Sequence, residues 1–252
     1  MMESVNILGV RIDDVTLEAA LAQVQVYLRE GSFHQIATIN PEFVVLAQKS
    51  MELRNALNGS ALNVPDGVGV LWAARRLGKP FSERVAGQEM VAQISRLAAQ
   101  ERFRVFLLGA REGIAERAAA ILCRRNPGLE IAGCHAGSPA LEEEDEIIGR
   151  VNAANAQILF VAYGPPRQEL WIARNAPRLN VSIAMGVGGT FDTIAGVVPR
   201  APQWIRRMGF EWTYRLLREP RRLKRQMTIP YFMWLMWTRG KQNSSTGRDA
   251  AS

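Results

Sequence analysis

Short apolar runs rich in β-branched residues alternate along most of the chain with longer segments whose apolar residues recur at helical spacing. The short runs predict strands at His34–Ile39, Ala61–Val64, Arg104–Leu108, Gln157–Ala162 and Val181–Met185. The longer segments predict helices at Thr16–Arg29, Pro41–Lys49, Gly67–Leu77, Gln88–Glu101, Glu112–Arg125, Leu141–Asn155 and Arg167–Asn175. Because strands that alternate with helices form parallel sheets covered by those helices, we expect an α/β fold with a mainly parallel, Rossmann-like sheet.

The residues that follow the five predicted strands are the place to look for a ligand, because parallel sheets bind ligands outside the carboxyl ends of their strands. All five segments are polar or glycine-rich. They read Thr38-Ile39-Asn40-Pro41-Glu42, Pro65-Asp66-Gly67-Val68-Gly69, Gly109-Ala110-Arg111-Glu112-Gly113, Tyr163-Gly164-Pro165-Pro166-Arg167-Gln168-Glu169 and Gly186-Val187-Gly188-Gly189-Thr190-Phe191-Asp192. Five such turns at one sheet edge favour a nucleotide-type ligand, whose phosphates backbone N–H groups can bind.

Taken singly, these turns have simpler interpretations. Asp66 could be an ordinary N-cap of the helix that follows it. The glycine turn at 186–192 matches a dinucleotide fingerprint only in part, since Phe191 stands where the third glycine is required. His34 and His135 are far apart in the sequence, and no Cys/His cluster has metal-ligand spacing. A group-transfer enzyme on this scaffold would therefore need a carboxylate base and cationic side chains rather than a metal.

The net charge is concentrated in one short segment. The 252-residue chain has a net charge of +7. Residues 200–225 hold nine Arg or Lys against two Glu, so this segment alone carries +7 and the rest sums to zero. Tyr231, Phe232, Trp234 and Trp237 follow it within seven positions. Cationic side chains beside amphipathic rings suit an anionic bilayer surface, and no apolar run reaches the roughly 18–20 residues that span one.

These features divide the chain into a main domain at residues 1–195, a basic, aromatic and helical appendage at 196–240 that associates with a membrane, and a disordered tail at 241–252. Clustered arginines could also bind nucleic acid, but no recognisable nucleic-acid-binding motif accompanies them, so we expect no nucleic-acid partner. A solvated helix face is the other alternative. Cys123 and Cys134 alone make a disulfide framework improbable, which favours a cytoplasmic location.

The turn motifs also occur in a known order. Together with Arg84-Val85-Ala86-Gly87, the segments after the predicted strands that begin at Thr38, Pro65, Gly164 and Gly186 resemble the WecG/TagA/CpsF family of bacterial glycosyltransferases (glycosyltransferase family 26). The resemblance runs from about residue 5 to residue 228. It includes Glu211-Trp212 and the run Glu219-Pro220-Arg221-Arg222-Leu223-Lys224-Arg225 of the basic appendage.

The resemblance implies a function. Such enzymes are inverting, metal-independent transferases that need no cofactor. They move a hexose, such as N-acetylmannosamine or its uronic acid, from a UDP-sugar donor onto a sugar linked to polyprenyl diphosphate. By this resemblance, residues 1–195 form the glycosyltransferase catalytic domain. The protein would act as a peripheral enzyme on the inner face of the cytoplasmic membrane, in the synthesis of surface polysaccharide or teichoic acid, and as a monomer or a homo-oligomer.

The resemblance also implies roles for individual residues. Asp66 would be the general base, with Thr38 and Asn40 orienting sugar hydroxyls in the same pocket. The donor and acceptor would be contacted by Arg84, Gln168, Tyr163 and Gly164. The nucleotide would lie at the turns of Gly109, Ala110 and Arg111 and of Gly186, Gly188, Gly189 and Asp192. Arg215, Arg222 and Arg225 would meet the charge of the leaving diphosphate, unless they form buried salt bridges instead.

Two other functions remain open at this point. A nicotinamide-dependent oxidoreductase would use the glycine turn, but this fingerprint is incomplete and no ribose-binding acid stands at the expected spacing. A non-catalytic membrane scaffold that binds a nucleotide would use the same turns without chemistry.

Overall fold

The computed structural model describes residues 3–198 and 227–239. Its strands are β1 (Ser4–Ile7), β2 (Val10–Asp13), β3 (His34–Ile39), β4 (Leu62–Pro65), β5 (Arg104–Gly109), β6 (Glu130–His135), β7 (Ile158–Ala162) and β8 (Ile183–Gly186). Its helices are α1 (Leu17–Glu30), α2 (Pro41–Ala47), α3 (Met51–Gly59), α4 (Val68–Arg76), α5 (Gly87–Glu101), α6 (Ile114–Arg125), α7 (Glu144–Ala153), α8 (Arg167–Asn175), α9 (Thr190–Ile194) and α13 (Thr228–Arg239), with 3-10 turns η1 (Leu141–Glu143) and η2 (Ala176–Arg178).

Six strands form one parallel sheet in the order β4-β3-β8-β7-β5-β6. This confirms the predicted α/β fold, and all five predicted strands are present. Because every strand runs in the same direction, their carboxyl ends share one edge. The chain returns β7 and β8 to the middle of the sheet, so the segments after β4, β3, β8 and β7 are neighbours at that edge.

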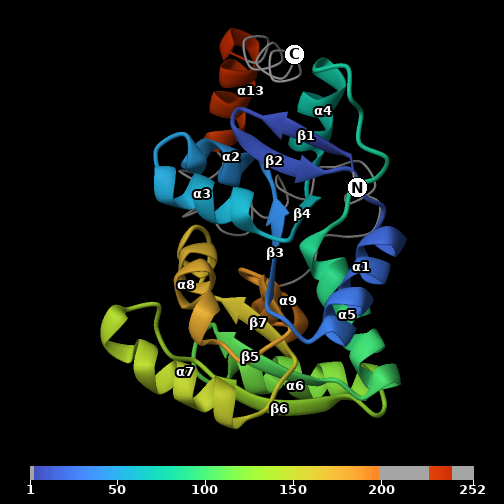
Figure 1. Cartoon of the computed structure of the whole chain (residues 1–252), viewed down its shortest axis with the longest axis vertical. Coiled ribbons are helices and arrows are strands. Elements are labelled where there is room, and N and C mark those ends of the chain that lie inside the picture. Colours follow the sequence, from blue (N-terminus) through green and yellow to red (C-terminus); the bar gives the residue numbers. More distant parts are fainter. Residues whose placement is uncertain (1–2, 199–226, 240–252) are drawn as a thin grey trace.

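The sheet lies between two layers of helices (Figure 1). The apolar side chains of β5 alternate: Val105 and Leu107 pack with α1, α5, α6 and α9 on one face, and Phe106 and Leu108 pack with α7 and α8 on the other. Alternation of this kind places successive side chains on opposite faces of a strand. Apolar residues on both faces of the strands are what a sheet covered on two sides requires.

Four elements were not predicted: the β1–β2 hairpin, α3, β6 and α9. The strand β6 lies at the edge of the sheet, and five of its six residues are only half-buried, so it lacks the continuous apolar pattern of a central strand. The hairpin is antiparallel and separate from the main sheet. It is tied to β4 by the buried Asn63, whose backbone N–H donates to Asp13 Oδ2 (2.8 Å) and whose Nδ2 donates to the carbonyl of Arg11 (3.0 Å).

The helix α13 docks on the main domain and belongs to its core. It packs against α2 and α4, where Phe232, Leu235 and Met236 enter the cluster formed by the hairpin and helices α2 to α4 (Figure 1). Phe232 is fully buried, so it is not part of an aromatic surface as the sequence had suggested. Trp234 and Trp237 remain exposed on the other side of this helix.

Within residues 3–198 and 227–239, no helix combines the length and the apolar character that a membrane span requires. The net positive segment at 200–225 and the predicted tail at 241–252 lie outside the described residues, so their predicted roles stay predictions.

If α13 is part of the core, Phe232→Ala should lower the free energy of unfolding by about 3 kcal/mol or more, because it leaves a cavity the size of an aromatic ring. Trp237→Ala, one turn further along and 74% exposed, is the matched control and should change it by less than about 0.5 kcal/mol. Denaturant unfolding monitored by circular dichroism measures both. Equal effects of the two substitutions would contradict the docking of α13.

Candidate active site

A cavity of about 530 Å³ opens over the carboxyl ends of β3, β4, β7 and β8. Its polar residues come from the segments that follow these strands and from the loop before α5. Of the predicted site residues, the cavity is lined by Thr38, Asn40, Asp66, Arg84, Gly164, Gln168, Gly186, Gly188 and Gly189. These residues span about 150 positions of sequence, and the parallel topology brings them to one place.

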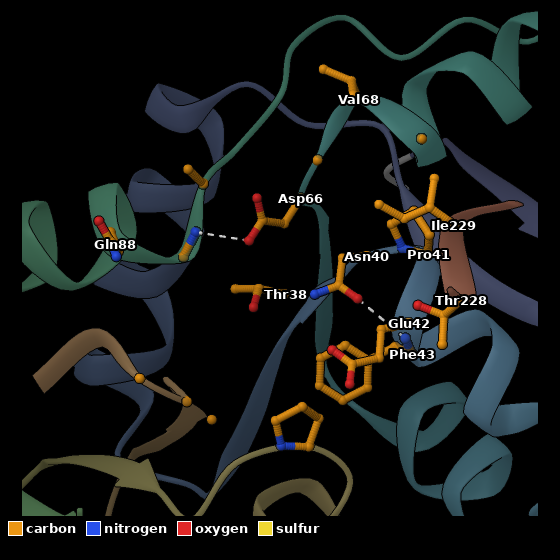
Figure 2. A pocket seen from close by; sticks show the side chains of 18 of the residues that line it. Thr38, Asn40, Pro41, Glu42, Phe43, Asp66, Val68, Gln88, Thr228 and Ile229 are labelled. Carbon is orange, nitrogen blue, oxygen red and sulfur yellow. Dashed lines mark hydrogen bonds between the residues drawn. The ribbon is translucent and has the colours of Figure 1, made fainter. Parts of the chain in front are cut away.

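Asp66, Thr38 and Asn40 lie together at the centre of the cavity (Figure 2). Asn40 caps α2, because its Oδ1 accepts a hydrogen bond from the Phe43 N–H (3.2 Å). Asp66 does not cap the helix that follows it, since the N-cap of α4 is Gly67, which makes no side-chain bond. Instead, Asp66 Oδ2 accepts from the Gly87 N–H at the start of α5 (3.4 Å). This bond holds the carboxylate at the cavity wall.

Several helices begin at this cavity. The first residues of α4 and α5, Val68 and Gly87, line it, and so does Gln168 in the first turn of α8. The N-terminus of a helix carries partial positive charge and N–H groups without an intrahelical partner. The cavity is therefore electrostatically suited to a phosphate or another anion.

Arg84 adds a full positive charge. It lies half-buried in the loop between α4 and α5 and lines the cavity. Among the residues that the structure describes, no carboxylate lies within 4.0 Å of its guanidinium. A half-buried guanidinium that is not neutralised by these residues can form a bidentate pair of hydrogen bonds with an anionic ligand such as a phosphate.

Gln168 joins two of the loops that form the cavity. Its Oε1 accepts from the Gly164 N–H after β7 (3.0 Å) and from the Gly188 N–H after β8 (2.9 Å). Its Nε2 donates to Oε1 of Glu169 (2.7 Å). The side chain is 2% exposed, so one amide group fixes the spacing of both loops. Gln168 was predicted to contact a substrate, and its position at the cavity is compatible with that while its amide oxygen already serves the protein.

Glu169 supports this amide from behind. It is 1% exposed, and the hydrogen bond from Gln168 is made to only one of its oxygens, with no partner for Oε2 among the described residues. Burial raises the pKa of Glu169 to about 8, although the bond from Gln168 opposes the shift. A side chain at Gly186 would overlap both Glu169 Oε1 and Gln168 Nε2, so only glycine fits beside this pair.

The other glycine turn does not face the cavity. Gly109 ends β5, Ala110 and Arg111 follow it, and β7 separates β5 from β8; none of the three residues lines the cavity. The backbone of Gly109 packs tightly against Ala162, and the Ala110 N–H donates to the carbonyl of Ala162 (3.3 Å). That N–H is therefore not available to a phosphate at this turn.

Arg111, Asp192 and Tyr163 also lie outside the lining of the cavity. Arg111 pairs with Asp192 on α9 (3.5 Å) at the surface. Tyr163 is buried edge-on against Trp171, with ring centroids 5.9 Å apart, in the core beneath α7 and α8. Burial raises the pKa of the Tyr163 phenol. Arg215, Arg222 and Arg225 lie outside the described residues, so their predicted contact with a leaving group stays a prediction.

The sequence had not pointed to the contribution of α13. The cavity is also lined from this helix by Thr228, Ile229, Phe232 and Met233. Ile229, Phe232 and Met233 stand at positions i, i+3 and i+4, the spacing of one helix face, which was a usable signal. Because of the nearby tryptophans and the charge of residues 200–225, the segment was interpreted as a membrane-binding surface instead.

The raised pKa of Glu169 predicts a pH dependence of stability. The folded protein holds this proton more tightly than the unfolded chain, so the free energy of unfolding should fall as pH rises from about 4.5 to 8. The free energy of unfolding should fall by up to about 4 kcal/mol over this range, provided that no water enters to solvate the Glu169 carboxylate. Glu169→Gln keeps the acceptor for Gln168 without a titratable group. Its melting temperature should exceed that of the wild type increasingly toward pH 8, and a constant difference across that range would contradict the assignment.

Comparison with known proteins adds a second, independent line of evidence. The family model described as "Glycosyl transferase WecG/TagA/CpsF family" matches residues 5–246. Similar proteins include the N-acetylglucosaminyldiphosphoundecaprenol N-acetyl-beta-D-mannosaminyltransferases of Staphylococcus aureus strains MW2 and NCTC 8325 / PS 47. Each is 33% identical over 232 residues, which cover 91% of this chain and 91% of the relative. This chain belongs to the WecG/TagA/CpsF family of glycosyltransferases.

Proposed function

We propose that the protein transfers a hexose from a UDP-sugar onto a sugar carried by polyprenyl diphosphate, with inversion at the anomeric carbon and without a metal ion. One observation carries this proposal. The carboxylate of Asp66 lies at the carboxyl end of the parallel sheet, in the same cavity as Thr38, Asn40 and several helix N-termini (Figure 2). The cavity therefore holds a base and an anion-binding wall facing the same space.

The chemistry needs both features at once. The acceptor hydroxyl attacks the anomeric carbon of the donor sugar, the bond from that carbon to the UDP oxygen breaks, and the hydroxyl proton moves to the carboxylate of Asp66. The Gly87 N–H donates to Oδ2 of Asp66 (3.4 Å), which holds the carboxylate at the wall of the cavity. Thr38 and Asn40 lie beside it, where they orient sugar hydroxyls.

The leaving UDP develops negative charge on its diphosphate. In this proposal the N-termini of α5 and α8 meet that charge, together with the guanidinium of Arg84. Arg215, Arg222 and Arg225 lie outside the described residues, and the family resemblance assigns them to the same role. The two hydrogen bonds that Gln168 Oε1 accepts keep the loops of Gly164 and Gly188 at a fixed distance from each other, and in this proposal the diphosphate binds at these loops.

The names of the relatives point to the sugars. The Staphylococcus aureus proteins are named for transfer of an N-acetyl-β-D-mannosaminyl group to N-acetylglucosaminyldiphosphoundecaprenol. We infer the same donor group and the same kind of acceptor for this chain, since the similarity covers 91% of both sequences.

Access to a lipid-linked acceptor requires the enzyme to reach a membrane, and we infer that it does so as a peripheral protein on the cytoplasmic face. Three aromatic residues of α13 are exposed, namely Tyr231, Trp234 and Trp237. This helix lies at one end of the molecule (Figure 1). Tryptophan and tyrosine favour the interface between water and lipid. The nine cationic residues at 200–225 would add attraction to anionic lipids.

The role of Asp66 is tested by release of UDP from UDP-N-acetylmannosamine in the presence of a lipid-diphosphate N-acetylglucosamine and of EDTA. Wild type should release UDP only with acceptor. Asp66→Asn, which keeps the size of the side chain, should lower kcat about a hundredfold or more. Asp145→Asn, the same change at an exposed position of α7 away from the cavity, serves as the control and should retain activity. Full activity of Asp66→Asn would exclude it as the base.

Membrane association is tested by sedimentation with vesicles that contain anionic lipid. The double variant Trp234→Ala, Trp237→Ala should bind at least about tenfold more weakly, because two interfacial rings are lost. Leu141→Ala removes an equally exposed apolar residue from η1, away from α13, and should bind like the wild type. Unchanged binding of the double variant would show that α13 does not touch the bilayer.

A further inference from the structure

One side of the cavity is apolar, although the donor sugar, the acceptor sugar and the diphosphates are all polar. Val68 and Trp72 line it from α4, and Ile229 and Met233 line it from α13. Three of these side chains, Val68, Trp72 and Met233, are among the exposed large apolar residues of the protein. Figure 2 shows Val68 above Asp66 and Ile229 to the right of Asn40, beside Pro41. We call these four residues the apolar wall.

The arrangement of the apolar wall follows from helix geometry. Val68 and Trp72 are four residues apart on α4, and Ile229 and Met233 are four residues apart on α13, so each pair lies on one helix face. The two helices contact each other. Two neighbouring apolar stripes therefore run along the mouth of the cavity. The stripe on α4 begins two residues after Asp66, so it starts beside the proposed base and leads away from it.

The chemistry of these residues selects the kind of occupant. The only polar group among the four side chains is the indole N–H of Trp72, so the apolar wall offers few hydrogen bonds to a sugar or a base edge. Exposed aliphatic and aromatic surface beside a polar site marks a place where an apolar ligand group is removed from water. A UDP-sugar carries no such chain. The acceptor named for the relatives carries an undecaprenyl chain next to its diphosphate.

We propose that Val68, Trp72, Ile229 and Met233 bind the first isoprene units of the polyprenyl chain of the acceptor. This inference rests on the proposed function and adds to it the place of the lipid. The direction is consistent with the membrane-facing residues, because Trp234 and Trp237 continue along α13 from Met233. The diphosphate of the acceptor then lies at the N-terminus of α4, between the apolar wall and Asp66, the acceptor sugar lies at Asp66, and the remaining chain leaves along α13.

The test separates this contact from docking to a bilayer by omitting membranes. Two water-soluble acceptors carry the same N-acetylglucosamine diphosphate, one ending in a farnesyl group and the other in a methyl group. Wild type should have the lower KM for the farnesyl acceptor. Trp72→Ala and Met233→Ala should each raise that KM about tenfold, because about 50 Å² of apolar contact is lost in each case. KM for the methyl acceptor and for the UDP-sugar should not change.

Met51→Ala is the matched control for Met233→Ala, since this exposed methionine of α3 does not line the cavity. It should leave both acceptors unaffected in the absence of membranes. A rise in KM for the UDP-sugar with Trp72→Ala would overturn the proposal, since Trp72 would then stack on the uracil. Equal losses with both acceptors, or equal wild-type KM values for the two, would also overturn it. Those failures leave transfer itself intact, whereas absence of transfer from any donor would remove the proposed function and this inference together.

Discussion

One amide group determines the geometry of the cavity. Gln168 receives the N–H groups of Gly164 and Gly188 on its oxygen and donates to Glu169 with its nitrogen. The segment after β8 is also joined to β7 by the Val187 N–H, which donates to the carbonyl of Val161 (2.8 Å). Because the amide is buried, breaking any of these bonds would leave a polar group without a partner, at a cost of about 1–3 kcal/mol. The spacing of the two loops is therefore fixed before any ligand arrives.

That fixed spacing explains the residues around it. Glycine is required at position 186, because a side chain there would occupy the space of Glu169 and Gln168. Glu169 holds the amide in one orientation by accepting the hydrogen bond from Gln168, and the burial that this position requires raises the pKa of Glu169. The polar group formed by Thr38, Asn40 and Asp66 does not depend on Gln168. Asn40 is positioned by capping α2, and Asp66 is positioned by its bond to the start of α5. The two halves of the cavity are thus built by different local interactions, and the parallel sheet brings them together.

Much of this could be predicted from the sequence. Apolar periodicity identified five of the six strands of the parallel sheet, and the polar turns after them identified most of the cavity, because parallel strands must end at one edge. The prediction was weakest in choosing among these turns, because the rule does not say which strand ends face the cavity. It treated the turn of Gly109 like that of Gly186, although β7 lies between β5 and β8 and the Ala110 N–H is used by Ala162. Tyr163 follows a strand too, but its ring turns into the core beside Trp171.

The helix α13 shows a different limit. Its aromatic composition suggested a membrane surface, while its apolar spacing placed Phe232 in the core and Ile229 and Met233 at the cavity. One helix can serve all three purposes, because its faces are distinct, and composition alone does not separate them. The docking of α13 depends on the hairpin and on α2 and α4, contacts between segments about 200 residues apart that no local pattern encodes.

The central claim is that the nucleotide binds over β8 and β7 with Asp66 facing the donor sugar. The most direct measurement is a crystal structure of the protein with UDP. The account predicts the diphosphate at the turn of Gly186–Gly189, near Arg84 and the N-termini of α5 and α8, with open space between it and the carboxylate of Asp66. UDP bound at the turn of Gly109–Arg111 instead, with the cavity empty, would contradict it.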